Sequence, residues 1–480
     1  MVRIYFDWNI YSYIRTERGQ VYSEINDFLS KNKSSILLAY SPAHLQDLNR
    51  SYFKSEKGKL ETEKDLDFLG DLTSNHCLCY DFKEKSVYPN VIHPKEYFQE
   101  IFVDTEDENL FNFENLFDND DPLGKLWQSY WKLLKLLPSG IDFTQLDKLP
   151  KEYQIINDFF KSTKGRNTFG GLLEDILNVI QNLDDFEKIF KTIRANSNKD
   201  LKIETDNSKW GNPFDYMDNV LKRNKLQKSF FELTTETIKN SNKKASRFDY
   251  FSNYYIQLDI FGYHKDKKLS NLIDDAAHSF YAAHTDIFVT DDDNTNRKSS
   301  ALYKQLNIDT EVVYSTGFLN CMRERKLFNE ERPLLEQVQY LIENSLLLMD
   351  SVDDELNPAR VFMIKPLILD YFNRMQISEY GNSTSLIFYK KQGNYSNFLF
   401  WTEMETVVNR IVKEFGTDDN NREIFQEIEK KEVLDNNWKG RFWSFRNFDI
   451  GMNYIEEPFG LAFKIEIKRT VNKDYDLLNG

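Results

Sequence analysis

The chain has few cysteines: Cys77, Cys79 and Cys321 are the three among its 480 residues. Three cysteines are too few for the disulfide framework that stabilises many secreted domains. The pair at 77 and 79 is spaced for alternation within a strand rather than for a zinc site. We therefore expect all three thiols to be reduced and to lie in or near the core.

The sequence also lacks the long apolar runs of membrane proteins. No stretch approaches the roughly 20 apolar residues that cross a bilayer. The first residues, Met1 to Asp7, are strand-like and do not have the pattern of a signal peptide. We expect a cytoplasmic protein that has no membrane partner.

An excess of positive charge is missing as well. The 62 Lys and Arg residues are outnumbered by 77 Asp and Glu residues, which gives a net charge of −15. Because Lys and Arg supply most phosphate binding, general affinity for nucleic acid is disfavoured. A polyanion would need a locally basic surface, and four segments offer one: 222–228, 239–247, 265–268 and 323–326. Each segment alone is more typical of a solvated helix face.

The chain does have ample material for a hydrophobic core. Its residues are 40% hydrophobic and include 38 Phe and 26 Tyr, a content that excludes wholesale disorder. A length of 480 residues exceeds what one core usually serves. We therefore expect at least two domains.

Strands and helices alternate at the start of the chain. The pattern predicts strands at 3–7, 36–40 and 77–80, and helices at 10–29, 42–53 and 60–72. The strand at 36–40 is continuously apolar, as expected for a strand buried on both faces. Such alternation predicts an α/β fold with a parallel sheet.

The same alternation returns after a long helical stretch. Residues 83–270 carry amphipathic segments at 126–137, 172–190 and 216–238. Beyond them the pattern predicts helix 272–283, strand 287–290, helix 296–306, strand 310–314 and helix 316–325. Neither part alone has enough strands for a stable sheet. We predict one α/β domain, residues 1–82 and 271–327, interrupted by a helical insertion, residues 83–270.

Residues 328–480 have a sequence pattern that differs from those of the α/β part and of the helical insertion. We expect a helix at 333–349, an apolar run at 360–364, a strand at 385–390, a helix at 395–415 ended by Gly416, and alternating strands at 441–448 and 461–468. This order predicts a separate C-terminal α+β domain.

Acidic residues follow two of the predicted strands of the α/β domain. Asp7 ends the first strand and Asp291 to Asp293 follow the strand at 287–290. Carboxylates at the carboxyl ends of parallel strands converge on one crevice, where a hard divalent cation finds oxygen ligands. Simpler roles are also open: Asp7 with Asn9 could cap a helix, and residues 291–296 could form a solvated turn.

Four motifs resemble those of PIN-domain nucleases. They are Asp7-x-Asn9 after the first strand, the segment from Tyr40 to Asp47, the helix start Asp274-Asp275-x-x-His278, and Thr290-x-Asp292 with Lys298 shortly after it. The resemblance covers about residues 1–82 and 270–325. The insertion and the C-terminal region lie outside it.

The resemblance implies a Mg²⁺- or Mn²⁺-dependent endonuclease that hydrolyses phosphodiester bonds, with RNA favoured over DNA. The implied metal ligands and catalytic residues are Asp7, Asp47, Asp275 and Asp292, with possible support from Asn9, Asp274, Thr290, Asp291 and Lys298. The sequence departs from the family in having Asp rather than Glu at 47, two candidates at 274 and 275, and three consecutive aspartates at 291–293.

Each of these side chains also has an ordinary interpretation. Asp47 could lie on the exposed face of its helix, Asp274 is expected to cap the helix that carries Asp275, and Lys298 could be a surface lysine. Thr290 could hydrogen-bond a ligand carboxylate or a phosphate, or simply end a strand. His44, His278 and His284 are expected to be satisfied core or surface histidines.

Three functional hypotheses follow. The first is the metal-dependent endonuclease, in a bacterial defence or toxin role, whose insertion and C-terminal domain select the substrate, bind a protein regulator or self-associate. The second is a non-catalytic PIN-like scaffold that binds nucleic acid or another partner. The third is a phosphatase of the haloacid dehalogenase type with Asp7 as nucleophile, which normally needs a second Asp where this chain has Asn9.

Overall fold

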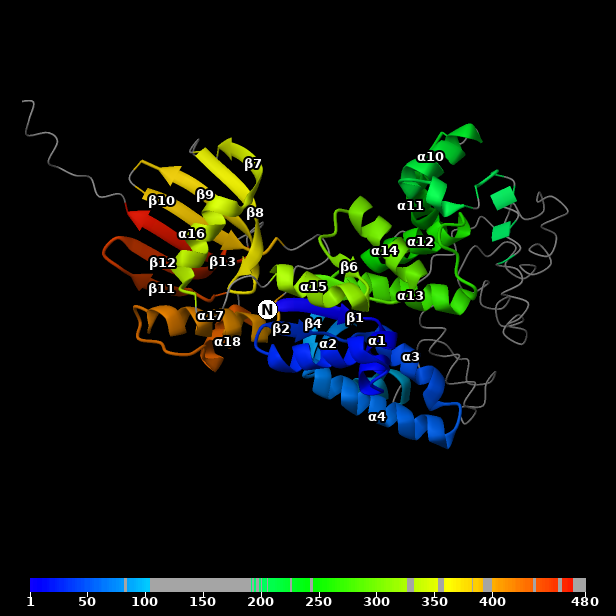
Figure 1. Cartoon of the computed structure of the whole chain (residues 1–480), viewed down its shortest axis with the longest axis horizontal. Helices are drawn as coiled ribbons and strands as arrows, with labels where there is room; N and C mark the ends of the chain where they lie inside the picture. The colour runs from blue at the N-terminus through cyan, green and yellow to red at the C-terminus, as the bar shows by residue number, and fades with distance from the viewer. Residues whose placement is uncertain are drawn as a thin grey trace, which may run out of the picture. The chain divides into compact units, whose positions relative to one another are not determined.

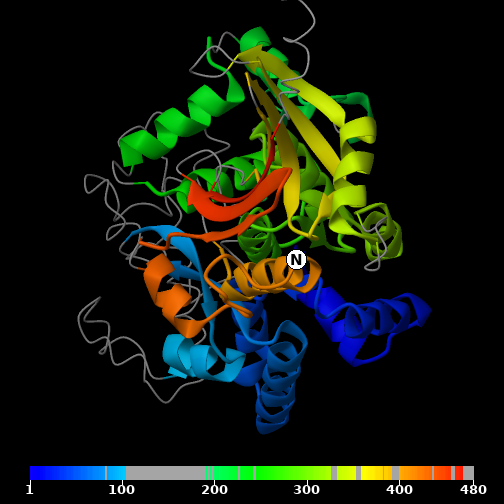
Figure 2. The same cartoon turned by 90° about the vertical axis from the view of Figure 1, so that its left-hand side faces the viewer.

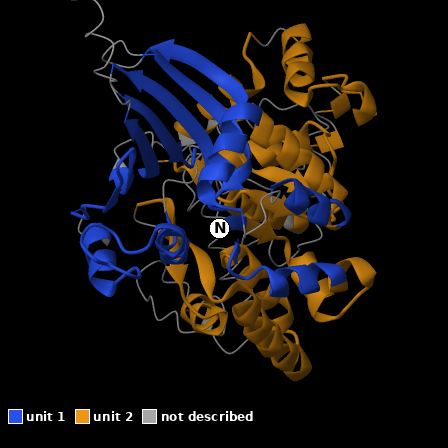
Figure 3. Cartoon of the chain, turned by 60° about the vertical axis from the view of Figure 1, so that its left-hand side comes forward, with its two compact units in different colours: residues 1–3, 24–37, 316–480 blue, residues 4–23, 38–315 orange. Residues whose placement is uncertain are grey.

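The structure is a computed structural model of the chain (Figures 1 and 2). It describes residues 1–81, 84–103, 191–325 and 332–468, apart from gaps at 192–193, 196–197, 200, 205, 225–226, 242–244, 353–357, 382, 392–398, 435–436 and 456–459. Two compact units are present (Figure 3): unit 1 contains residues 1–3, 24–37 and 316–480, and unit 2 contains residues 4–23 and 38–315.

A four-stranded parallel sheet confirms the predicted α/β class. Its strands, in spatial order, are β2 (Ile36–Leu38), β1 (Val2–Phe6), β5 (Ile287–Val289) and β6 (Glu311–Val313). Ile4 pairs with Ile287 and Phe6 with Val289, so segments far apart in the sequence form one sheet. All residues of β1, β2 and β5 are buried, which explains their continuous apolar sequences.

The strand predicted at 77–80 has a different partner from the one expected. β3 (His76–Asp81) pairs antiparallel with β4 (Ser86–Val91), a strand that the sequence did not predict. A parallel bridge joins Cys77 to Tyr40, whose carbonyl oxygen accepts from the amide of Leu78 at 2.8 Å. The hairpin therefore forms a two-stranded sheet of its own, which this bridge links to the segment that follows β2. Cys77, Cys79 and Cys321 are buried free thiols, as predicted.

The helix predicted at 10–29 is divided in two. α1 (Trp8–Arg15) and α2 (Gln20–Lys31) are separated by a turn in which Gly19 has φ +135°, a conformation that favours glycine. The following helices of the α/β part are α3 (Pro42–Tyr52), α4 (Glu56–Thr73), α13 (Leu269–Ala282), α14 (Asp293–Gln305) and α15 (Ser315–Arg325).

The described part of the predicted insertion is mainly helical. After β4 it contains α5 (Pro94–Phe98), the π-helix η1 (Gln99–Val103), the 3-10 helix η4 (Asn207–Lys209), α10 (Pro213–Arg223), α11 (Phe230–Ser241) and α12 (Arg247–Ile260). The stretch at 216–238 is broken because the side chain of Asn224 caps the end of α10 at Val220. The segments at 126–137 and 172–190 lie outside the described residues.

A seven-stranded antiparallel sheet with three helices forms most of unit 1. Its order is β11 (Arg441–Ser444), β12 (Phe448–Ile455), β13 (Gly460–Lys468), β10 (Ser383–Tyr389), β9 (Phe372–Tyr380), β8 (Pro358–Ile368) and β7 (Leu346–Val352). The helices are α16 (Leu334–Asn344), α17 (Trp401–Phe415) and α18 (Glu427–Leu434). The predicted helix at 333–349 is wrong beyond Asn344, where the chain turns into β7.

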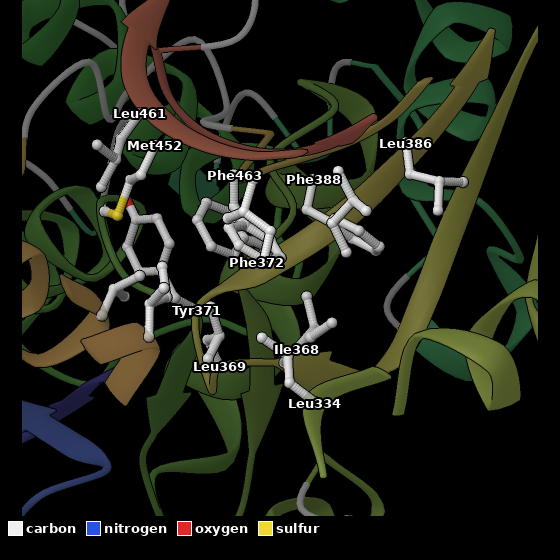
Figure 4. Close-up of a cluster of buried hydrophobic side chains, with 14 of the residues drawn as sticks. Leu334, Ile368, Leu369, Tyr371, Phe372, Leu386, Phe388, Met452, Leu461 and Phe463 are labelled. Carbon is white, nitrogen blue, oxygen red and sulfur yellow. The ribbon is translucent and has the colours of Figure 1, made fainter. Parts of the chain in front are cut away.

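The core of unit 1 lies between the sheet and the helices α16 and α17. Figure 4 shows Phe372, Phe388 and Phe463 from neighbouring strands gathered on one face of the sheet. Leu334 from α16 and Met404 from α17 belong to the same buried cluster. In the described part of the chain no helix is long and apolar enough to cross a membrane.

Candidate functional site

The strand order places two strand ends of unit 2 beside each other. From β1 the chain passes to β2 on one side and, much later, to β5 on the other, so the order reverses between β1 and β5. A crevice for ligands forms outside the carboxyl ends of the strands at such a point. Asp7 directly follows β1, and Thr290 to Asp292 follow β5. The two segments thus meet where the sheet predicts a site.

Asp7 points into the site instead of capping α1. It occupies the N-cap position of α1, but its side chain makes no capping hydrogen bond. Its Oδ2 accepts a hydrogen bond from the Thr290 hydroxyl at 3.0 Å, and that hydroxyl accepts one from the amide of Asp292 at 3.2 Å. Burial raises the pKa of Asp7, and the charges of Asp47 and Asp292 raise it further. His278 and the hydrogen bond from Thr290 oppose this shift. The capping alternative for Asp7 is therefore wrong.

Asp47 and His278 lie against each other beside Asp7. Nε2 of His278 is 2.8 Å from Oδ2 of Asp47, and Nδ1 of His278 is 2.8 Å from the hydroxyl of Tyr5. Asp7, Asp47 and His278 each offer one ligand atom, and these atoms lie within 4.8 Å of one another. We call these three residues the first group. His278 was expected to be a satisfied core or surface histidine, but the structure brings it into the site.

The charge on His278 depends on two opposing effects. Burial lowers the pKa of its imidazole, whereas the hydrogen bond to Asp47 and the charges of Asp47, Asp7 and Asp274 raise it, and the net shift is upward. An imidazolium here partly neutralises the surrounding carboxylates. A cation bound to Asp7 and Asp47 would serve the same purpose, with the imidazole then neutral.

A second acidic group adjoins the first. Asp266, Asp275 and Asp292 offer ligand oxygens that also lie within 4.8 Å of one another. We call them the second group. Burial, and then the charges of Asp266 and Asp7, raise the pKa of Asp275 well above its usual value. The four expected ligands are thus divided between the groups, and the repulsion of Asp7 with Asp275 and Asp292 links the groups electrostatically.

Asp274 does not cap its helix, contrary to the sequence prediction. The N-cap of α13 is Lys268, so Asp274 lies in the second turn, where its carboxylate pairs with the guanidinium of Arg50. Its Oδ1 is buried and has no hydrogen-bond partner among the described residues. Burial and the charge of Asp47 raise the pKa of Asp274 to about 7, although Arg50 and His278 oppose this.

The three consecutive aspartates have separate roles. Asp291 accepts hydrogen bonds from the Tyr22 hydroxyl at 2.7 Å and from the Ser315 amide at 2.8 Å. Asp293 accepts one from the Tyr314 hydroxyl at 2.6 Å. Asp292 belongs to the second group and also caps α14, because its Oδ1 accepts from an amide of that helix at 2.8 Å.

Two other candidate supporting residues, Asn9 and Lys298, differ in their burial. Asn9 is exposed on α1. Lys298 is fully buried, so the interpretation as a surface lysine is wrong: its ammonium pairs with Asp266, lies 3.5 Å from Oδ2 of Asp259 and stands 4.8 Å from the centre of the Tyr255 ring.

Two other histidines are satisfied core residues, as predicted. Nδ1 of His44 accepts from the amide of Ser41 at 3.0 Å, which leaves Nε2–H to donate to the carbonyl of Phe6 at 2.7 Å. Burial lowers the pKa of His44 well below its usual value. His284 is buried, with Nδ1 3.0 Å from the carbonyl oxygen of Phe280.

Two members of the site, His278 and Asp266, were not predicted. The sequence does contain a pattern that could have identified His278. Asp275 and Asp274 precede His278 by three and four residues, the spacing that puts helical side chains on one face. Asp266 follows α12 among three lysines, in a segment that reads as basic surface. Its position depends on how α12 returns to the sheet, which local sequence does not reveal.

The chemistry of both groups fits a divalent cation. The first group offers two carboxylates and an imidazole, and the second offers three carboxylates. Oxygen ligands suit Mg²⁺ and Mn²⁺, and an imidazole suits Mn²⁺ and later transition metals better than Mg²⁺. The buried Oδ1 of Asp274, which lacks a hydrogen bond among the described residues, also favours a nearby positive charge.

Comparison of the chain with protein-family models, with curated proteins and with solved structures gives no match.

Proposed function

We propose that the protein is a metal-dependent endonuclease that hydrolyses phosphodiester bonds, with RNA as the favoured substrate and DNA as a possible one. The observation that supports this most is the meeting of Asp7, Asp47 and His278 with a second acidic group at the carboxyl ends of β1 and β5. Carboxylates from separate segments that repel one another create a strong demand for a cation. The PIN-domain resemblance of the motifs points to the same activity.

The residues have distinct tasks under this proposal. Asp7 and Asp47 would hold Mg²⁺ or Mn²⁺, which when bound activates water and offsets the charge of the scissile phosphate. Thr290 fixes the orientation of the Asp7 carboxylate through its hydroxyl. Tyr5 orients the His278 ring, so that Nε2 faces Asp47 and the site.

Substrate choice and cellular role follow from the resemblance and the composition. PIN-like nucleases cut RNA more often than DNA, and we extend that preference to this chain. A net charge of −15 implies that the nucleic acid is held by local basic segments or by a partner protein. We also propose a cytoplasmic role in bacterial defence or as a toxin, with the insertion or unit 1 controlling access.

The test compares cleavage of one labelled single-stranded sequence as RNA and as DNA by the purified full chain. Mn²⁺ or Mg²⁺ should support cleavage and chelator should abolish it. Asp7→Asn should reduce the rate by roughly 100-fold or more, because several kcal/mol of charge stabilisation is lost. The matched control is Asp71→Asn, which changes an exposed aspartate on α4 and should be silent. Equal rates for wild type and Asp7→Asn contradict the proposal.

One observation favours the non-catalytic alternative. Several acids of the site already have a partner in the protein: Asp274 pairs with Arg50, Asp266 with Lys298, and Asp47 with His278. Such pairs could make the cluster a purely structural network in a PIN-like scaffold that binds nucleic acid or another protein. Calorimetric titration with Mn²⁺ separates the two functions, since a scaffold of this kind binds no ion at Asp7 and Asp47.

A further inference from the structure

We propose that Lys298 is a resident cation of the second group, and that it limits the site to one divalent ion, bound at Asp7, Asp47 and His278. This inference rests on the proposed metal-dependent function and specifies its stoichiometry. It concerns a lysine whose ammonium is enclosed by acidic side chains at the edge of the site.

The burial of Lys298 is the first argument. Its side chain is 0% exposed, and a buried ammonium requires compensating carboxylates. Asp259 is 2.7 Å from Arg194, which already compensates its charge. The charge of Lys298 is therefore balanced mainly by Asp266, the second-group carboxylate with which it pairs.

The second argument is that both carboxylate oxygens of Asp266 already accept hydrogen bonds. Its Oδ2 accepts from the Lys298 ammonium and its Oδ1 accepts from the side-chain amide of Asn294 at 3.0 Å. One oxygen of Asp292 is likewise engaged by the amide of Thr295 at 2.8 Å. A metal ion in the second group would have to displace the ammonium and then remain beside it, which like-charge repulsion opposes.

The first group contrasts with this arrangement. Asp7 accepts from the neutral hydroxyl of Thr290, and Asp47 contacts the imidazole of His278. A hydroxyl can stay in place when a metal binds, and an imidazole can lose its proton and become a ligand. Asp7 and Asp47 together carry two negative charges, which match one divalent ion.

The ring of Tyr255 holds the ammonium in position. It lies 4.8 Å from Nζ of Lys298, within the range of a cation–π interaction. Tyr255 is itself fully buried, so this contact is shielded from water. Lys298 is thus a positioning residue: it neutralises Asp266 and supplies near the site a fixed positive charge that a second metal would otherwise supply.

The experiment measures how many Mn²⁺ ions the full chain binds, by equilibrium dialysis with metal analysis and by electron paramagnetic resonance. Wild type is expected to bind one ion and to give the spectrum of an isolated Mn²⁺. Lys298→Met is expected to bind two and to give the spectrum of a spin-coupled pair. Lys298→Arg keeps the charge and should bind one. Lys298→Gln keeps a donor for Asp266 without the charge, and it replaces Lys298→Met in the test if the latter does not fold.

The other outcomes separate the two proposals. Two ions in wild type, or one ion in folded Lys298→Met or Lys298→Gln, overturn the role of Lys298 and leave the nuclease proposal standing. No ion in wild type overturns the metal-dependent function itself. Asp7→Asn locates the wild-type ion, because retention of that ion with unchanged affinity would place it in the second group, against the inference.

Discussion

The hydroxyl of Thr290 donates to Oδ2 of Asp7 at 3.0 Å and joins two residues that lie 283 positions apart in the chain. Both residues are buried at the ends of neighbouring parallel strands. The same hydroxyl accepts from the amide of Asp292. One side chain thus connects a member of the first group to the backbone of a member of the second.

Replacing Thr290 with valine should weaken metal binding. The change keeps the shape of the side chain but removes the donor to Asp7 and the acceptor for the Asp292 amide. Loss of an outer-shell hydrogen bond typically costs 10- to 100-fold in metal affinity, so we expect the dissociation constant for Mn²⁺ to rise roughly 10-fold or more in calorimetric titration.

A suitable control for this change is Thr234→Val in α11, which also removes a buried hydroxyl. That hydroxyl donates to the carbonyl of Phe230 at 2.8 Å, and neither residue belongs to the first or the second group. It should leave the Mn²⁺ affinity unchanged. An unchanged affinity in Thr290→Val as well would mean that Asp7 does not hold the ion.

The strand ends of this site could be predicted because their sequences are unambiguous. β1, β2 and β5 are buried throughout and therefore continuously apolar, and an aspartate after such a strand is conspicuous. The order of the strands then brings Asp7 and Asp292 to one edge. The convergence of the two aspartates follows from the general rule for strand ends in open α/β sheets and from no local sequence signal.

Other features could not be predicted, because they depend on packing between distant segments. β7 begins with Leu346, Leu347 and Leu348, which continue the apolar pattern of the preceding amphipathic helix. All three leucines are nevertheless exposed and lie in a strand. β4 has mostly exposed side chains, contains Pro89 and has no alternation strong enough to mark a strand. The pairing of Lys298 with Asp266 likewise depends on how α12 and α14 meet.

The raised pKa of Asp274 gives the metal-free protein a contribution to stability that is lost as the pH rises. In the unfolded chain this carboxyl group ionises near its usual value of 3.8, whereas in the folded state its pKa is about 7, chiefly because of burial. Between these values the folded state holds the extra proton, so the free energy of unfolding falls with increasing pH. The buried N-terminal amine, whose pKa is lowered to about 5, acts in the opposite sense, so thermal melts of the chelated protein from pH 4.5 to 8 should compare wild type with Asp274→Asn.

Asp274→Asn should lose less stability with rising pH than wild type does, since an amide does not titrate. Asp71→Asn changes an exposed carboxylate and should leave the slope as in wild type. Adding Mn²⁺ at pH 8 should raise the melting temperature of wild type by roughly 5 °C at a concentration 100 times the dissociation constant. A slope that is the same in Asp274→Asn and wild type would contradict the assigned pKa.

Unit 1 contains a buried ion pair whose removal should cost far more stability than any surface charge. Two guanidinium nitrogens of Arg3, Nε and Nη2, each donate to a carboxylate oxygen of Glu403 at 2.7 Å, and the two side chains are 1% and 0% exposed. Glu403 also accepts from the amide of Phe400 at 2.9 Å. Removing one partner of such a pair leaves an uncompensated buried charge and typically costs 3–5 kcal/mol.

Glu403→Gln should therefore lower the free energy of unfolding by about 3 kcal/mol in urea titrations followed by tryptophan fluorescence. Glu405→Gln, two residues further along α17, changes an exposed carboxylate and should cost less than about 0.5 kcal/mol. Burial raises the pKa of Glu403, but Arg3 and Lys390 lower it more, so the net pKa is below 4.5. The stabilisation is then present above pH 4.5 and is lost as the pH falls through the folded-state pKa. Equal losses in the two variants would show that the pair contributes no more than a surface carboxylate.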